Sequence, residues 1–262
     1  MEFALAEQGD KRTLETERVF EPKLDGERAF LVRSKEGVAL INRRKRDITG
    51  HFPEIALAAA ALPVGTVLDG EITIPLLDGA HNCPSTAWRA NALVSRAAGL
   101  AKSQPAIFVA FDILFKDNVD QRRLPLFQRR HALEVLADIC PSAFFLVPQM
   151  PDGWMAWKVW VDFEGGEGVM AKDMNAAYSG RRSSAWVKVK AWKEEDFLVL
   201  GFTSQVREVS TLELSNGHEV NCPRADEGRL VKQALSEGKE VVASVRYLPP
   251  YRFPILAKVE VR

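Results

Sequence analysis

Apolar and polar residues follow one another along the chain in patterns that predict both strands and helices. Apolar residues recur at 29–33 and 38–42 on either side of a short polar turn at 34–37, a pattern typical of a β-hairpin. The nearly continuous apolar run at 106–115 predicts a buried strand, and the periodicity of 126–139 predicts a helix. The first part of the chain therefore mixes strands with helices.

Weaker patterns complete this part of the chain. We expect further strands at residues 66–74, 167–172 and 184–193, and further helices at 53–62 and 85–98. Pro53 suits the first turn of its helix, and Ser85 is a suitable N-cap for the other. Residues 184–193 alternate apolar with cationic side chains, as a half-buried strand does.

After residue 193 the pattern changes to short strands with a single helix. We expect strands at 197–202, 211–214, 219–222, 240–247 and 255–261, and a helix at 226–236. Five strands and one helix in so short a segment suit a small oligonucleotide-binding (OB) barrel. We therefore predict an α+β protein of two domains, residues 1–193 and 194–262, with the acidic stretch 193–196 as the hinge.

Four aromatic residues recur at helical spacing, namely Trp154, Trp157, Trp160 and Phe163. Such a stripe can stack on nucleic-acid bases. It is more often part of a hydrophobic core, and we expect core packing here.

Composition narrows the class of protein. Hydrophobic residues make up 47% and charged residues 27%, as in an ordinary soluble protein, and no apolar run is long enough to span a membrane. The three cysteines lie far apart without a CxxC pair, which argues against a zinc ribbon and favours a reducing, cytoplasmic setting. Residues 1–12 lack the apolar core of a signal peptide.

Charge is balanced over the whole chain but uneven locally. The 35 basic residues equal the 35 acidic ones, so the molecule as a whole exerts no long-range attraction on nucleic acid. Arg43, Arg44, Lys45 and Arg46 nevertheless form a basic run, and a second group of cations lies within residues 181–193. Local groups of this kind can hold phosphates.

Lys23 stands between Glu21 and Asp25 and is followed by Gly26 and Arg28. It can be an ion-pair partner at a strand edge or a nucleophile, and the stretch alone leaves both interpretations open. A lysine must be neutral to attack, although an unperturbed lysine has a pKa of about 10.4. Burial or neighbouring cations are needed to lower that value.

Four later segments carry further candidates, each with a structural alternative. Glu71 on a strand can be merely exposed, and Phe111 is more often a core residue than a ligand platform. Glu167 beside glycines can close a turn, and Lys188 with Lys190 can form a solvated strand face. Each segment taken singly favours the structural interpretation, but their joint order and spacing are hard to assign to chance.

This combination resembles the covalent nucleotidyltransferase superfamily and, within it, the ATP-dependent DNA ligases. The family's K-x-D-G-x-R motif matches residues 23–28, and an arginine followed by D-x-T-G-x-[FY]-P matches 43–53. D-G-E, A-F-D, E-G-[VL]-M-x-K and W-x-K-x-K match residues 69–71, 110–112, 167–172 and 186–190. The resemblance implies a nucleotidyltransferase domain with ATP-grasp-like antiparallel sheets around a nucleotide cleft, followed by the OB-fold β-barrel.

The resemblance also implies three transfer steps. Lys23 would attack the α-phosphorus of ATP and form a lysine–AMP adduct, with pyrophosphate as the leaving group. The 5′-phosphate at a nick in double-stranded DNA would then take the AMP, and the 3′-hydroxyl would displace AMP and seal the backbone. Such transfers depend on positioning and charge neutralisation. Mg²⁺, for which Mn²⁺ can substitute, needs oxygen ligands, and Glu71 and Glu167 are the candidates.

The resemblance assigns other candidates to the nucleotide. Glu21 would contact the amino edge of adenine, Phe111 would stack on the base, and Arg28 would hold the ribose or a phosphate. Lys188 and Lys190, two apart on a strand, would share one face and meet the α-phosphate.

The remaining candidates would serve phosphate and DNA. Arg182 would hold a phosphate of the nucleotide, Asp25 would serve the sealing step, and Arg43 would hold the 5′-phosphate of the nick. We expect the rest of the basic run to bind the DNA backbone: Arg44, Lys45 and Arg46.

Two features depart from the larger relatives. Because only a short segment precedes Lys23, we expect a minimal ligase without the N-terminal DNA-binding domain of larger ligases or the extra segment of NAD-dependent ones. The family's last motif begins at residues 252–254 but lacks its final Asp-Lys. That motif orients pyrophosphate in relatives, so the part of Lys258 or Arg262 in the first step is left open.

Two other functions compete with DNA ligation. An RNA ligase or an mRNA-capping guanylyltransferase shares the K-x-D-G lysine, although the segments at 47–53, 167–172 and 186–190 resemble DNA ligases more closely. A non-catalytic nick-binding scaffold is supported by the shortened last motif alone. We expect a monomeric enzyme that uses ATP and Mg²⁺, binds nicked DNA and has no membrane partner.

Overall fold

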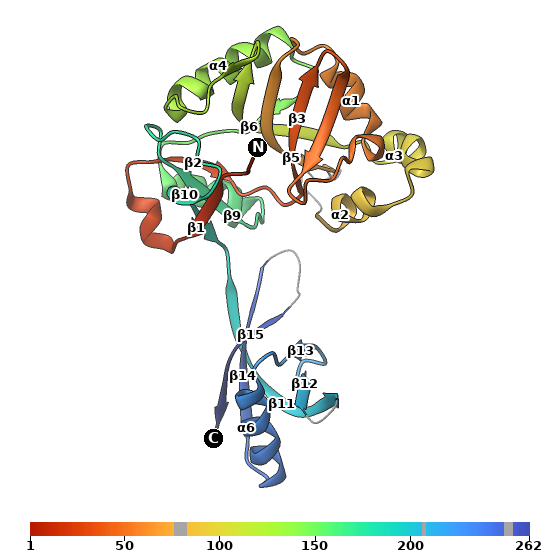
Figure 1. Ribbon diagram of the computed structural model, residues 1–262. Coiled ribbons are helices and arrows are strands. Elements are labelled where there is room, and N and C mark those ends of the chain that lie inside the picture. The colour runs from red at the N-terminus through yellow and green to blue at the C-terminus, as the bar shows by residue number, and fades with distance from the viewer. Residues whose placement is uncertain (76–82, 206–207, 249–253) are drawn as a thin grey trace. The chain divides into compact units, whose positions relative to one another are not determined.

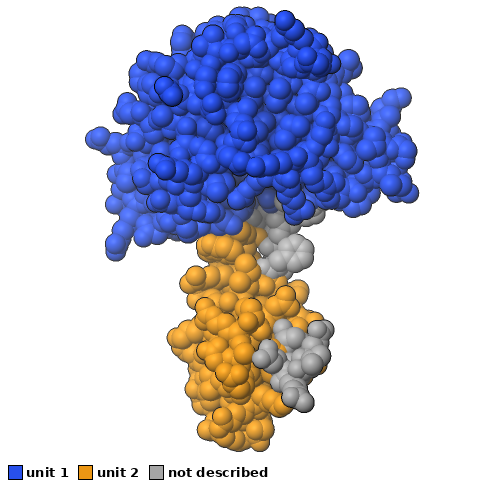
Figure 2. Space-filling view, in the orientation of Figure 1, with its two compact units in different colours: residues 1–190 blue, residues 191–262 orange. Residues whose placement is uncertain are grey.

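The computed structural model describes residues 1–75, 83–205, 208–248 and 254–262. The chain forms two compact units, residues 1–190 and 191–262, which Figure 2 shows in different colours. Each unit has a hydrophobic core of its own, so the two are described separately.

The larger sheet of the first unit has six strands in the order β4-β3-β5-β6-β7, with β8 paired to β6. Its strands are β3 (Glu27–Ser34), β4 (Gly37–Asn42), β5 (Thr66–Thr73), β6 (Ile107–Lys116), β7 (Val119–Asp120) and β8 (Phe145–Leu146). Neighbours run antiparallel except β8, which is parallel to β6. The β3–β4 hairpin closes at Gly37, whose φ of +137° suits a residue without Cβ.

The smaller sheet of this unit has four strands in the order β1-β10-β9-β2. Its strands are β1 (Leu5–Gln8), β2 (Val19–Pro22), β9 (Gly168–Lys172) and β10 (Arg182–Lys190). β1 runs parallel to β10, and the other neighbours run antiparallel. The sheet therefore places the first strands of the chain beside strands that lie far along the sequence (Figure 1).

Helices accompany both sheets (Figure 1). The α-helices are α1 (Pro53–Ala59), α2 (Cys83–Asn91), α3 (Ala97–Ser103), α4 (Leu126–Ile139) and α5 (Gly153–Trp157). Short 3-10 helices span Lys11–Glu15, Thr49–His51 and Val94–Arg96, and a π-helical turn spans Lys158–Phe163. Leu133 and Leu136 of α4 are buried in one cluster with Ile113 of β6. Each such buried leucine contributes about 1.5–3 kcal/mol of hydrophobic stabilisation.

The second unit is a five-stranded antiparallel sheet with one helix. Its strands are β11 (Lys193–Gln205), β12 (Glu208–Leu214), β13 (Glu219–Asn221), β14 (Val241–Tyr247) and β15 (Ile255–Val261), in the order β13-β12-β11-β14-β15. Helix α6 (Ala225–Ser236) connects β13 to β14. Val231 of α6 is buried against the sheet together with Leu212 and Ala243.

Most of the predicted elements are confirmed. The hairpin, the apolar strand at 106–115 and the helix at 126–139 correspond to β3–β4, β6 and α4, and α4 has the predicted bounds. The short strands and the helix expected after residue 193 are also present. β1 and β2 were not predicted, because four residues are too few to display a period.

The single helix predicted at 85–98 is wrong. The chain leaves the helix after Asn91, becomes extended at Leu93, and resumes in α3. Arg89 explains the break, because its buried guanidinium donates to the carbonyl oxygens of His51 and Gln104, at 3.1 and 2.8 Å. These bonds fix the end of α2. The side chain of Ser85, the expected N-cap, lies outside the described residues.

Two further expectations need correction. The acidic stretch at 193–196, expected as a hinge, is the first part of β11, where Arg246 of β14 donates to Glu194 at 2.6 Å. The aromatic stripe is divided: Trp157 and Trp160 are buried, whereas Trp154 and Phe163 are exposed. The change from α-helix to π-helix at residue 158 shifts the angular spacing, so the four rings do not share one face.

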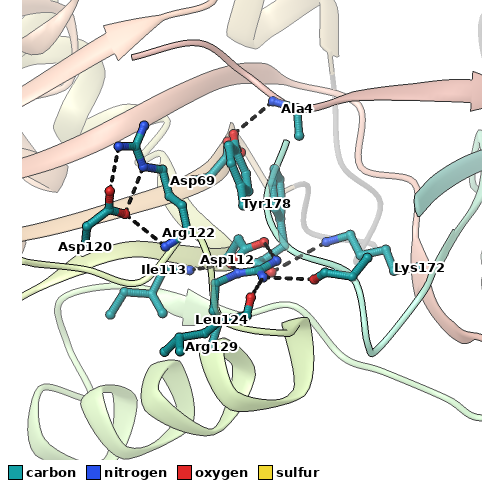
Figure 3. Close-up of polar contacts among 12 residues, drawn as sticks. Ala4, Asp69, Asp112, Ile113, Asp120, Arg122, Leu124, Arg129, Lys172 and Tyr178 are labelled. Atoms are coloured by element: carbon teal, nitrogen blue, oxygen red, sulfur yellow. Dashed lines mark hydrogen bonds and ion pairs between the residues drawn. The ribbon is translucent and has the colours of Figure 1, made fainter. Parts of the chain in front are cut away.

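Two ion pairs of the larger sheet allow a direct test of how burial affects stability (Figure 3). Arg129 of α4 and Asp112 of β6 are both fully buried, with Nε–Oδ1 and Nη2–Oδ2 distances of 2.7 and 2.9 Å. Arg122 and Asp120 make a similar pair whose side chains are 38% and 41% exposed. The pairs share the same chemistry but differ in solvent access.

We predict that Asp112→Ala lowers the free energy of unfolding by about 3–5 kcal/mol, because it leaves the Arg129 charge buried and unpaired. The matched change Asp120→Ala should cost at most about 1 kcal/mol, since water solvates the remaining Arg122. Urea unfolding followed by tryptophan fluorescence measures both. Equal losses in the two variants would contradict the assignment of Asp112–Arg129 as a buried, structure-determining pair.

Candidate active site

Lys23 lies in the loop between β2 and β3, and the fold brings this loop against β9 and β10. The backbone N–H of Lys23 donates to the carbonyl oxygen of Gly168 at 2.9 Å. Its Nζ forms an ion pair with Oε2 of Glu167, and Oε1 of Glu167 lies 3.0 Å from Nζ of Lys190. One carboxylate is thus shared by two ammonium groups from distant parts of the sequence.

Gly26 keeps the same loop close to β5. A Cβ atom at residue 26 would lie 2.1 Å from the carbonyl oxygen of Ile72, a backbone atom that cannot move aside. The position therefore requires glycine. The close approach of loop and strand leaves Lys23, Asp25 and Glu71 lining one cavity.

This cavity has a volume of about 280 Å³ and is lined by residues from both sheets of the first unit. Most of the predicted site residues line it: Glu21, Lys23, Asp25, Arg28, Arg43, Glu71, Phe111, Arg182 and Lys188. Glu167 and Lys190 join the site through their ion pairs at Lys23. Residues predicted from six separate segments are therefore brought together.

Aromatic side chains and a buried ion pair form one wall of the cavity. Phe111 and Trp186 meet edge to face, with ring centroids 5.7 Å apart. Nζ of Lys172 lies 4.5 Å from the Phe111 centroid, 4.1 Å from the Trp186 centroid and 2.6 Å from Oε2 of Glu21. Lys172 and Glu21 are almost fully buried, and a lysine tolerates such burial only when it is paired.

Arg28 is held in place by a network that reaches the N-terminal strand. Its guanidinium makes a bidentate pair with the fully buried Asp69, with Nε–Oδ1 and Nη2–Oδ2 distances of 3.0 and 2.6 Å. Its Nη1 donates to the carbonyl oxygen of Ala4 at 2.7 Å. Tyr178 donates its hydroxyl proton to Asp69 at 2.7 Å and accepts the N–H of Ala4 at 2.9 Å (Figure 3). Arg28 thus presents a fixed positive charge to the cavity.

The carboxylates of the site have contrasting proton affinities. Burial raises the pKa of Glu71 to about 8, and Asp69 and Asp25 add to the effect while Arg28 and Lys23 oppose it. Burial also acts against ionisation of Glu167, but Lys23 and Lys190 outweigh it and lower the pKa of Glu167. Glu71 therefore retains a proton near neutral pH, whereas Glu167 is ionised.

The cations influence one another as well. Burial lowers the pKa of Lys188, and the neighbouring positive charges of Lys190, Lys23 and Arg182 lower it further. Trp186, Lys188 and Lys190 alternate along β10 and so occupy one face of it, as expected from their spacing. A cavity with several cations at its wall favours a polyanionic ligand.

Glu71 and Glu167 were the candidate metal ligands. No group of three or more His, Cys, Asp or Glu side chains that could hold a metal ion occurs among the described residues. Mg²⁺ does not require one, because it is commonly bound by one or two carboxylates together with substrate phosphates and water. Glu71 fits this role, since a nearby cation would favour its ionised form. Glu167 fits only if a lysine leaves one of its oxygens.

The basic run turns sharply after β4. The side-chain oxygen of the buried Asn42 accepts the backbone N–H groups of Arg44 and Arg46, each at 3.0 Å, and Lys45 has a φ of +60°. Arg43 lines the cavity, whereas the three following cations are exposed and do not line it. The run therefore divides into one residue at the site and three on the adjoining surface.

Four site residues were not predicted. Lys172 and Asp69 stand within motifs that had been matched. A charged residue within an otherwise apolar strand was the signal that could have identified them, and both are buried. Tyr178 and Gln149 carry no such signal, because their segments have neither a period nor a motif. Only the folded chain places them beside Asp69 and Glu21.

The shortened last motif belongs to the second unit. Arg252 and Phe253 lie outside the described residues. Lys258 pairs with Glu260 on β15, which raises the pKa of Lys258, and Arg262 is exposed at the end of the described chain.

Comparison with known proteins places these features in a family. A family model described as ATP dependent DNA ligase domain matches residues 4–190. DNA ligase C2 of Mycolicibacterium smegmatis is 37% identical over 187 residues, which cover 70% of this chain and 52% of that protein. A probable DNA ligase of Mycobacterium sp. (strain KMS) is 36% identical, with coverage of 70% and 35%. The chain thus spans about half the length, or less, of these curated relatives.

Solved structures share the fold. The ligase domain of LigD from M. tuberculosis is 23% identical with a TM-score of 0.64, and 100% of this chain and 94% of that one are covered. A Lig E DNA ligase, from a study of DNA binding with a minimal scaffold, is 20% identical with a TM-score of 0.72 and coverage of 100% and 99%. The mixed α/β fold is therefore that of ligase nucleotidyltransferase domains. None of the described helices combines the length and the hydrophobicity needed to cross a membrane.

The raised pKa of Glu71 predicts a specific dependence of stability on pH. A folded-state pKa of about 8 against an ordinary value of 4.5 means that the stability from the protonated form is fully present below about pH 4.5 and is lost as pH rises through 8. Glu71→Gln keeps the uncharged shape at every pH. We expect the variant to match the wild type near pH 5 and to exceed its free energy of unfolding at pH 9 by roughly 1–3 kcal/mol, allowing for water at the cavity wall.

Urea unfolding of both proteins across this pH range measures the difference, in which the contributions of all other groups cancel. A difference that stays constant with pH would show that Glu71 is ionised throughout.

Proposed function

This chain belongs to the family of ATP-dependent DNA ligase domains, and we propose that it seals nicks in double-stranded DNA through a covalent lysine–AMP intermediate. One observation carries the proposal: Lys23 lies in the wall of a cation-lined cavity, with its Nζ against Glu167. A structural lysine would need only the ion pair. A nucleophile needs in addition a cavity that admits the phosphate it attacks, and this site has one.

In the first step the amine of Lys23 gives up a proton and its lone pair attacks the α-phosphorus of ATP. A P–N bond forms, the bond from the α-phosphorus to the bridging oxygen breaks, and pyrophosphate leaves with that oxygen. Lys188 and Lys190 share the face of β10 beside Lys23, where their charges would stabilise the negative charge on the α-phosphate. Apart from the bond to Lys23, the protein takes no covalent part in this step. The rate therefore depends on how the reacting groups are positioned and how their charges are neutralised.

The rest of the cavity would hold the nucleotide. Glu21 would accept a hydrogen bond from the amino group of adenine, and Phe111 would stack on the base beside Trp186. The fixed guanidinium of Arg28 would bind the ribose or a phosphate. Arg182, which lines the cavity and donates to the carbonyl oxygen of Ala6, would meet another phosphate.

Glu71 and Glu167 would hold Mg²⁺, which when bound neutralises charge on the phosphates; Mn²⁺ takes the same oxygen ligands. Glu71 is the stronger candidate because it lines the cavity without an ion pair of its own among the described contacts. Glu167 would contribute once the nucleotide has drawn a lysine away from it.

The later steps involve DNA. Arg43, which lines the cavity, would hold the 5′-phosphate that takes the AMP, and Asp25 would serve the attack by the 3′-hydroxyl. The exposed cations that follow would bind the DNA backbone: Arg44, Lys45 and Arg46.

We propose that residues 1–193 form the adenylation domain and residues 194–262 an OB-fold barrel. The compact units at 1–190 and 191–262 support this division. In the second unit β11, β12 and β13 form a meander, a helix precedes β14, and β15 lies close to β13. These features support a small, partly open five-stranded barrel.

We predict that incubation with ATP and Mg²⁺ adds one AMP to the wild type and none to Lys23→Ala. Lys23 is the proposed nucleophile, so its removal should abolish the adduct rather than weaken it. Intact-mass spectrometry measures the adduct directly. The matched variant Lys239→Ala, which removes an exposed lysine paired with Glu237, should be adenylated normally.

Other outcomes point to the competing functions. A GMP adduct formed from GTP would indicate a capping enzyme, and sealing of RNA but not DNA nicks would indicate an RNA ligase. A wild type that gains no adduct, and loses none on treatment with pyrophosphate, would leave only a binding role.

We further predict that binding to nicked DNA weakens steeply with salt. Each phosphate contact adds about 0.9 to the slope of log K against log salt, so Arg44→Ala and Arg46→Ala should each reduce the slope by about one. Arg122→Ala, which removes a cation from the far edge of the larger sheet, should leave it unchanged. Fluorescence anisotropy at several salt concentrations measures the slopes. A wild-type affinity independent of salt would refute the role of the basic run.

A further inference from the structure

Glu21 is held at both of its carboxylate oxygens. Nζ of Lys172 lies 2.6 Å from Oε2, and the side-chain amide nitrogen of Gln149 donates to Oε1 at 2.8 Å. The Glu21 side chain is 2% exposed, and Glu21 is one of the residues that line the cavity. Contacts at both oxygens restrict how the carboxylate can turn and still leave each oxygen able to accept a further hydrogen bond.

Gln149 reaches Glu21 because of a backbone bridge next to both residues. Phe20 and Met150 exchange two hydrogen bonds, with N–H to O distances of 2.8 and 2.9 Å in the two directions. Gln149 precedes Met150 and Glu21 follows Phe20, so the bridge brings the two side chains together. Phe20 is fully buried, which anchors the bridge in the core.

The second hydrogen bond determines the plane of the carboxylate. The terminal torsion of a glutamate side chain has a broad, two-fold potential, so a contact at one oxygen does not fix it. Lys172 packs against the rings of both Phe111 and Trp186 and contacts Oε2 alone. Rotation of the carboxylate about that point is therefore limited by Gln149.

We propose that Gln149 is a positioning residue for purine selection: by fixing the plane of Glu21, it aligns Oε1 to accept from a 6-amino purine and to repel a 6-oxo purine. This inference rests on the proposed function, because it takes ATP as the ligand of the cavity. Gln149 itself is absent from the described residues that line the cavity, and it acts through Glu21.

The 6-amino and 6-oxo purines differ in the group that they would present to Glu21. Adenine carries an amino group at C6, which donates to a carboxylate. A 6-oxo purine carries a carbonyl oxygen at the same place, whose lone pairs face those of Glu21. A carboxylate free to rotate can turn away from the carbonyl, and it is also less well aligned for the amino group. Loss of Gln149 should therefore disfavour the 6-amino purine and favour the 6-oxo purine, and both effects reduce the selectivity for ATP.

The test compares ATP with inosine 5′-triphosphate, which has an oxo group at C6, as donors to Lys23. Gln149→Leu keeps the volume of the side chain and removes the amide donor. We expect its ratio of kcat/KM for ATP over inosine triphosphate to fall about tenfold or more below that of the wild type, the range for a hydrogen bond to a charged group. Gln233→Leu removes a similar but exposed hydrogen bond, to Glu237, and should leave the ratio unchanged.

A structural effect would give a different result. If Gln149→Leu merely loosened the fold, both nucleotides would react more slowly by the same factor and the melting temperature would fall. An unchanged ratio, with or without a lower rate, would overturn the positioning role.

Binding measurements separate this inference from the proposed function. If the wild type forms no AMP adduct, the selectivity can still be measured as the ratio of the binding affinities for ATP and inosine triphosphate. Calorimetric titration gives these affinities for the wild type and for Gln149→Leu. A selectivity for ATP that the variant loses would support the role of Gln149 even though the ligase function had failed. Equal binding of both nucleotides by the wild type, or binding of neither, would overturn the inference.

Discussion

The bidentate ion pair between Arg28 and Asp69 ties the fold of the first unit to its site. Asp69 is fully buried in β5, and its charge is compensated by Arg28 of the neighbouring strand and by the hydroxyl of Tyr178. Arg28 and Tyr178 in turn bind the backbone of Ala4, just before β1. The same guanidinium lies 5.3 Å from the ring centroid of Phe111 in the cavity wall. A change to any member of this network alters both the sheet and the site.

Buried pairs of this kind recur through the first unit. Two further ion pairs join oppositely charged side chains that are nearly or fully buried: Glu21–Lys172 and Asp112–Arg129. Because desolvation costs most of what the attraction gains, such pairs add little net stability, but breaking one leaves an uncompensated charge. They therefore act mainly by excluding alternative arrangements. For a cavity proposed to hold reacting groups in a defined geometry, this restriction matters more than net stability.

Part of this arrangement could be predicted from the sequence. Lys23, Glu71, Glu167 and Lys188 stand in motifs with fixed spacing, and the strands that carry Glu71 and Lys188 follow from apolar patterns. Local patterns failed where a long-range contact decides the backbone, as at the end of α2, which Arg89 fixes through His51 and Gln104. Local patterns also failed to identify the site residues that belong to no motif.

Gln149 illustrates that second failure. It lies 128 positions from Glu21 in the sequence and meets it only through a bridge between neighbouring residues. No local period or composition reports such a contact, because the contact depends on where two distant segments cross. The residues proposed to do the chemistry are thus easier to find in a sequence than the residues proposed to orient them.

The carboxylate of Glu167 places a final constraint on the proposed chemistry. It forms ion pairs with both Lys23 and Lys190, and these contacts hold the proposed nucleophile in place. Two unit charges 4 Å apart interact by about 4 kcal/mol near a protein surface, so a triphosphate that enters the cavity competes strongly for the same cations. In the proposed reaction, a phosphate that draws Lys190 away would leave Glu167 paired with Lys23 alone, as the nearest carboxylate to the proton that Lys23 has to lose. On this proposal, nucleotide binding and activation of the nucleophile would be coupled through the one carboxylate that Lys23 and Lys190 share.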